Sequence, residues 1–138
     1  MTLHHRLFSL EEANALLPEL DSRMGLIEHA RERYAHLHDE ILMHELVVRA
    51  ELEAGMVEDS AGLDSTVHHL EAILQELERE IDAILKLGCF VRSLERGWVD
   101  FPAARGSEKI YYCWRRGEAS IGFYHTGRDG ATERQPLD

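Results

Sequence analysis

The chain has 138 residues, of which 15 are Lys or Arg and 26 are Asp or Glu, so its formal net charge is −11. This length predicts one domain spanning residues 1–138, and a hydrophobic fraction of 44% excludes general disorder. The acidic balance argues against nucleic acid as a partner. The absence of an apolar run near ~20 residues argues against a membrane span. Two cysteines without a disulfide framework favour a cytoplasmic location.

The charge and the aromatic residues divide the chain at Gly88. Residues 1–88 contain 7 basic and 19 acidic side chains, whereas residues 89–138 contain 8 basic and 7 acidic ones. Eight of the ten aromatic residues follow Gly88. Acidic, Leu-rich sequence is typical of helices, and aromatic, Gly-punctuated sequence is typical of sheets. We therefore expect an α+β fold, with a helical hairpin over 1–88 and a β-meander and tail over 89–138.

The first helix is predicted to begin at a capping box formed by Ser9 and Glu12, with Phe8 packing on Ala13. Pro18 lacks an N–H group, so it should kink or break the helix near Leu17. A second helical pattern runs from Glu19 to about Ala54. Its apolar positions step by three and four residues, as in a coiled coil: Ile27, Ala30, Tyr34, Leu37, Ile41, His44 and Val48.

A loop is expected over residues 55–63, followed by a helix capped by Asp64, Ser65 or Thr66 and ended by Gly88. This helix has the same three-and-four spacing, which predicts antiparallel pairing with the preceding helix. A two-helix hairpin leaves apolar surface uncovered, so we expect a homodimer formed through the helices. The apolar positions of this helix are Val67, Leu70, Leu74, Leu77, Ile81 and Ile84.

Three antiparallel strands are predicted at about 97–101, 109–115 and 120–126, with a possible fourth at 90–92. A register that pairs Phe101 with Ile110 and Trp114 with Ile121 divides the sheet into two faces. We expect one face to pack on the helices: Val99, Phe101, Ile110, Tyr112, Trp114, Ile121, Phe123 and His125. The other, with Trp98, Asp100, Tyr111, Cys113, Arg115, Gly122 and Tyr124, is interpreted as either a dimer contact or a recognition patch.

The nine histidines offer little support for a metal site, and the sequence indicates no particular cofactor. The stripe His36, Glu40 and His44 has helical spacing, but its outer histidines are ~12 Å apart along the axis, too far for one ion. Any site would need a ligand such as His68 from the next helix. Hence these four residues are weak candidates, and the expectation is that no metal binds. Motifs for nucleophilic catalysis and nucleotide binding are absent from the sequence.

Four segments carry a resemblance to a known family: GCFVRSLERGWVDFPA, KIYYCWRRGEASIGFYH, a tail ending RQPL and the opening FSLEEANALLPEL. The chain resembles the bacterial family called domain of unknown function 2203 over nearly its whole length. The resemblance implies a small cytoplasmic bacterial protein and no particular activity. Trp98 departs from the smaller aliphatic residue usual in relatives. The resemblance draws attention to Arg92, Asp100, Phe101, Trp114, Arg115, Glu118 and His125.

The leading hypothesis is a self-associating binding or assembly protein with an aromatic recognition patch for a small molecule or a protein. The candidate binding residues are Arg92, Trp98, Asp100, Tyr111, Tyr112, Cys113, Trp114, Arg115, Glu118, Tyr124 and His125. The alternative is an enzyme, or a metal- or ligand-dependent site, built around Asp100, Arg115, Glu118 and His125. The sequence does not decide between them. A toxin-like ribonuclease is a weaker idea that rests on fold analogy alone.

Overall fold

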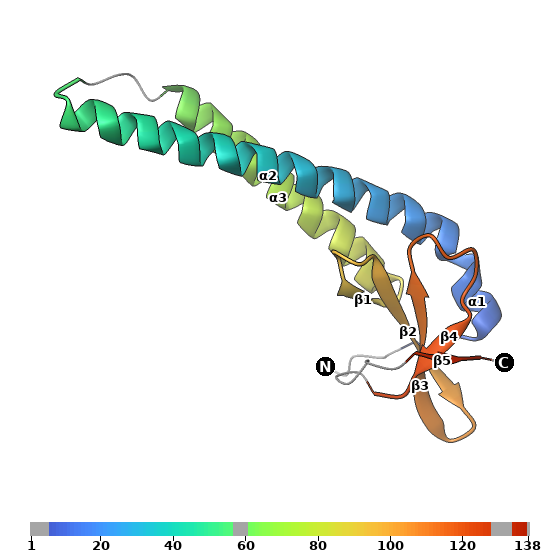
Figure 1. Cartoon of the computed structure of the whole chain (residues 1–138). Helices are drawn as coiled ribbons and strands as arrows, with labels where there is room; N and C mark the ends of the chain where they lie inside the picture. Colours follow the sequence, from blue (N-terminus) through green and yellow to red (C-terminus); the bar gives the residue numbers. More distant parts are fainter. Residues whose placement is uncertain (1–5, 57–60, 128–133, 138) are drawn as a thin grey trace. The chain divides into compact units, whose positions relative to one another are not determined.

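The structure is a computed structural model that describes residues 6–56, 61–127 and 134–137, with the backbone alone for residues 61–63. It confirms the α+β class: three helices precede an antiparallel sheet of five strands (Figure 1). The chain divides into two compact units. One unit is Ile27–Arg79, and the other combines Met1–Leu26 with Glu80–Asp138. None of the helices in the described ranges has a stretch long and apolar enough to cross a membrane.

The N-terminal helices are separated where Pro18 predicts a break. Helix α1 spans Leu10–Ala15, Leu16 caps its end, and α2 spans Leu17–Glu53. Pro18 therefore lies in the first turn of α2, where its missing N–H is not needed. The predicted capping box is confirmed, since the Ser9 and Glu12 side chains each accept a hydrogen bond from the other residue's backbone N–H.

Helix α3 spans Ala61–Lys86 and runs antiparallel to α2 (Figure 1). The parts of α2 and α3 between Ile27 and Arg79 make up the first unit. Burial along α2 confirms the predicted seam, because its seven residues are all buried or half-buried. The prediction for α3 is wrong at Leu74, which is exposed, while Ile73 is buried instead. Helix α3 also begins earlier than expected, so Asp64, Ser65 and Thr66 lie inside it. Residues 57–60 of the predicted loop lie outside the described residues.

The second unit contains the sheet, whose spatial order follows the chain. Gly88, with φ +101°, follows the end of α3 as predicted, and β1 begins two residues later. The tail adds a fifth strand that the sequence did not reveal, because only two of its residues pair. The strands are β1 (Phe90–Ser93), β2 (Trp98–Arg105), β3 (Glu108–Arg115), β4 (Phe123–His125) and β5 (Gln135–Pro136).

The predicted register is wrong between both pairs of strands, with different consequences. Phe101 lies opposite Tyr112 instead of Ile110, a shift of two residues that leaves the faces of β2 and β3 as expected. Strand β4 is shifted by one residue, since Cys113 lies opposite Phe123. A shift of one exchanges the two faces of a strand. Phe123 and His125 therefore lie on the face of Asp100, whereas Tyr124 lies with Tyr112.

The turn after β3 explains the shift. Glu118 folds back onto the strand: its carboxylate accepts from the Arg115 backbone N–H at 2.7 Å, and its carbonyl accepts from the Trp114 indole at 2.9 Å. The next residues pair elsewhere, since the Ile121 N–H donates to the Asn14 side chain at 2.8 Å. Strand β4 consequently begins only at Phe123.

Candidate functional site

One face of the sheet gathers most of the candidate residues, and we call it the polar sheet face. Among the side chains that the β2–β3 and β3–β4 registers place there are Trp98, Asp100, Tyr111, Cys113, Arg115, Phe123 and His125. Trp98 and Tyr111 are only 7% and 8% exposed. The aromatic rings on this face therefore pack around buried charged groups, with little of either ring exposed.

Asp100 is the centre of the polar sheet face, although it is only 2% exposed. Its Oδ2 accepts from Arg92 Nε at 2.8 Å, and its Oδ1 contacts His125 Nε2 at 2.9 Å. Arg92 comes from β1, Asp100 from β2 and His125 from β4, so this carboxylate links three strands. A buried carboxylate needs such partners, because removing an unpaired charge from water is very unfavourable.

His125 is also only 2% exposed, and both its ring nitrogens and its ring faces have neighbours. Its Nδ1 contacts the Gly127 carbonyl at 2.7 Å, so both ring nitrogens face oxygen acceptors. The ring stacks on Tyr111, with centroids 5.4 Å apart, and meets Trp98 edge-on at 6.1 Å. The histidine therefore has the partners of a structural residue.

Two arginines approach the Trp98 ring. The guanidinium carbon of Arg115 lies 4.9 Å from the ring centroid, and that of Arg92 lies 5.9 Å away. Such contacts are favourable because the face of an indole is electron-rich. Arg92 also has the carboxylate of Asp100, but none of the described carboxylates lies within ion-pair distance of Arg115. Among the described residues, the guanidinium of Arg115 therefore has an aromatic ring as its neighbour and no carboxylate within ion-pair distance.

A second ion pair lies beside this face, between the predicted candidate Glu118 and Arg134, which was not among the candidate residues. Arg134 Nη2 donates to Glu118 at 2.8 Å and 3.0 Å and to the Cys113 carbonyl at 3.3 Å. The Arg134 guanidinium also lies 4.1 Å from the Phe123 ring centroid. Sequence offered no periodic signal for Arg134, which lies in the tail. The one signal at this position was the tail motif RQPL, which begins at Arg134.

The remaining candidates do not lie on the polar sheet face. The register places Tyr112, Trp114 and Tyr124 on the opposite side. The Tyr124 hydroxyl donates to Gln135 at 2.9 Å, and its ring contacts Arg105. Trp114 is buried, and together with Glu118 it lines a pocket of about 350 Å³ whose other walls include Asn14, Leu17, Pro18, Asp21, Gly117 and Ala119.

The two cysteines are free and buried, and burial raises the pKa of both thiols, that of Cys89 to about 12 and that of Cys113 to about 11. At pH 8 we therefore expect only about one Cys113 in a thousand to be a thiolate, and alkylation by iodoacetamide, followed by mass spectrometry, to be very slow until the chain is unfolded. Stability should be independent of these thiols below pH ~9 and fall above it, because the unfolded thiols ionise first. Alkylation of the folded chain at the rate of free cysteine would contradict this prediction.

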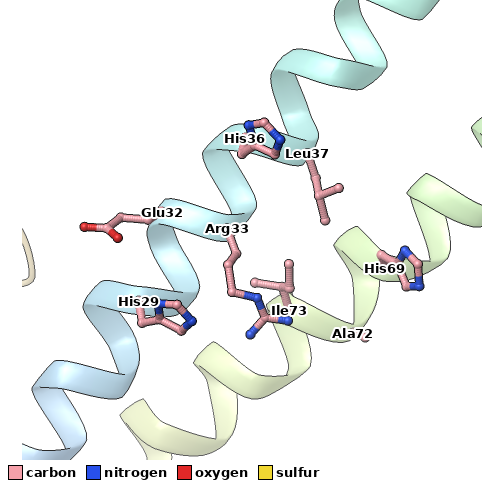
Figure 2. Close-up of a pocket in the computed structure, with 8 residues that line it drawn as sticks. All are labelled: His29, Glu32, Arg33, His36, Leu37, His69, Ala72 and Ile73. Atoms are coloured by element: carbon pink, nitrogen blue, oxygen red, sulfur yellow. The ribbon is translucent and has the colours of Figure 1, made fainter.

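The helices offer a separate groove of about 520 Å³ between α2 and α3 (Figure 2). Arg33, Leu37 and Ile73 lie between the two helices, and Arg33 donates to Glu76 at 3.2 Å. The other lining residues are His29, Glu32, His36, His69 and Ala72.

The weak metal candidates on the helices have other contacts. His36 contacts Glu40 at 2.9 Å and His68 lies 3.9 Å from Glu71, both in exposed pairs within one helix. His44 is half-buried in the helix seam. Within residues 6–56, 61–127 and 134–137, no three His, Cys, Asp or Glu side chains are grouped as metal ligands would be.

Comparison with known proteins gives one match. A family model described as an uncharacterized conserved protein, DUF2203, matches residues 6–137. No curated protein and no solved structure matches the chain. The match includes both helices of the hairpin, all five strands and every residue of the polar sheet face. The chain therefore belongs to the DUF2203 family, as its sequence motifs suggested.

Proposed function

We propose that this chain is a self-associating binding protein, in which the helical hairpin forms a dimer and the polar sheet face recognises a ligand. Support for the first part comes from apolar side chains exposed on α2. Leu42, Met43, Leu46 and Val47 are 48%, 60%, 48% and 52% exposed. Their i, i+1, i+4, i+5 spacing makes one stripe, on the side of α2 away from Ile41, His44 and Val48 of the seam.

Contact with α3 does not cover this stripe, and we propose that a second copy of the hairpin packs on it. Pairing two hairpins gives a four-helix arrangement, in which each α2 has apolar neighbours on two sides. Leu74 on α3, 41% exposed, adds apolar surface to the same unit. Contiguous exposed apolar side chains on a small chain are typical of protein interfaces. The stripe is the observation that carries this proposal.

Sedimentation velocity of the full chain at tens of micromolar tests the dimer. We expect wild-type protein to sediment as a dimer and the Leu46→Lys variant as a monomer, with at least a tenfold weaker association, because a lysine in the apolar contact must lose its hydration. Glu45→Lys is the matched control, since it places the same side chain on the neighbouring residue, outside the stripe. A wild-type chain that is monomeric, or a Leu46→Lys variant that dimerises normally, would contradict the proposal.

The enzyme alternative has less support. Asp100 and His125 form the acid–base pair that such a site would need, at 2.9 Å. Both are 2% exposed, and their polar atoms are already occupied by Arg92 and by the Gly127 carbonyl. A general acid or base must reach the proton that it transfers. The pair is better explained as a buried support for the residues around Trp98.

A further inference from the structure

Unsatisfied hydrogen-bond donors cluster around the polar sheet face. Five buried side-chain nitrogens have no hydrogen-bond partner among the described residues, and one of them, His44 Nε2, lies on α2. The other four are N–H donors at this face: Arg92 Nη2, Trp98 Nε1, Arg115 Nε and Arg134 Nε. Leaving one such donor unpaired costs about 1–3 kcal/mol, and more when the group is charged. Most buried polar groups in proteins have partners, so four orphaned donors beside one another need an explanation.

These donors belong to neighbouring side chains. Arg92 and Arg115 both contact the Trp98 ring, and Arg134 reaches the carbonyl of Cys113, which lies opposite Asp100 in the register. The four side chains thus come from β1, β2, β3 and the residue before β5. Trp98 itself is 7% exposed, so its indole N–H lies in a place where water is scarce.

The charges at this place are also unequal. Three guanidinium groups, those of Arg92, Arg115 and Arg134, lie near two carboxylates, those of Asp100 and Glu118. Asp100 is shared by Arg92 and His125, and Glu118 by Arg134 and the Arg115 backbone N–H. Among the described residues, the Arg115 guanidinium is the one of the three without a carboxylate partner. One bound negative charge would balance its positive charge.

We propose that the polar sheet face binds a small-molecule oxyanion, a carboxylate or a phosphate, through Arg115 together with the N–H groups of Trp98, Arg92 and Arg134. The guanidinium fork matches two oxygens of such a group, and a guanidinium stacked on an aromatic ring keeps its edge available for hydrogen bonds. This inference rests on the proposed recognition role of the sheet and is independent of dimerisation.

Tryptophan fluorescence of the full chain tests the proposal, since Trp98 and Trp114 are its two tryptophans. The chain is titrated with inorganic phosphate in one series and with acetate in another, each at constant ionic strength balanced by chloride. We expect a saturable change with at least one of the two, and the series that saturates identifies the preferred oxyanion. No saturable change in either series up to ~10 mM would overturn the proposal, whatever the sedimentation of the chain shows.

Substitutions locate the site. Arg115→Gln should weaken binding at least tenfold, and Arg115→Lys, which keeps the charge but loses the fork, should weaken it less. Arg105→Gln is the matched control, because Arg105 is an exposed arginine of the same sheet that contacts Tyr124 on the other face. If Arg115→Gln does not fold, the loss of binding is measured on the Arg115→Lys variant alone. Unchanged binding in the folded Arg115 variants, or equal loss in Arg105→Gln, would overturn the assignment.

Discussion

Replacing Asp100 by alanine is expected to lower the free energy of unfolding by about 3–5 kcal/mol. The substitution removes the carboxylate that joins Arg92 to His125, at 2.8 Å and 2.9 Å, and leaves Arg92 Nε and His125 Nε2 without this partner. Because Asp100 and His125 are almost completely buried, water cannot replace the lost contacts. Breaking a buried ion pair on one side is among the most destabilising single changes in proteins.

Urea denaturation followed by circular dichroism measures this effect. Asp82→Ala is the matched control: Asp82 contacts Lys86 at 2.9 Å in an exposed pair, so its loss should change stability little. Asp100→Asn keeps the shape of the side chain but not its charge, and it should fall between wild type and Asp100→Ala. If Asp100→Ala unfolds at the same urea concentration as wild type, the buried charge cluster around Asp100 does not exist in solution.

Replacing Phe101 by alanine should cost a similar amount, about 3–5 kcal/mol, for a different reason. Phe101 is fully buried on the face of β2 opposite Asp100, where its ring meets Phe8 edge-on with centroids 5.3 Å apart. Removing the ring leaves a cavity and deprives Phe8 of its main aromatic contact. The Phe8 backbone also donates to the Pro102 carbonyl at 2.8 Å, so the N-terminal segment should loosen at this point.

The same denaturation experiment measures the loss, with Phe101→Leu as control. Leucine fills much of the space of the ring, so the loss should be clearly smaller than for alanine. Hydrogen exchange should show faster exchange of the Phe8 N–H in Phe101→Ala. A loss below ~1 kcal/mol for alanine would mean that Phe101 is not packed as the structure has it.

The helices were predictable because their signals are local and repeat along the chain. The Ser9–Glu12 capping box, the break near Pro18 and the glycine after α3 each depend on a few neighbouring residues, and all three are present in the structure. The sequence did not predict that Ile73 would be buried in place of Leu74. Both residues are apolar and adjacent, so periodicity alone gave no reason to prefer one over the other.

The candidate site was predictable only in part, because strand register decides which side chains meet. Trp98, Asp100, Tyr111, Cys113 and Arg115 were assigned to one face correctly, since the shift between β2 and β3 is an even number. His125 was assigned to the wrong face, because Glu118 folds back and delays β4 by one residue. Arg134 joins the site through a contact 16 residues away in the chain, for which no local pattern exists.

A native mass spectrum of the freshly purified chain, alongside the Arg115→Gln variant, tests dimerisation and oxyanion binding most directly. We expect a species at twice the 15.8 kDa of the chain, carrying a small anion that the variant lacks. A bare monomer of 15.8 kDa at tens of micromolar, with no retained or added phosphate or carboxylate, would contradict both dimerisation and oxyanion binding.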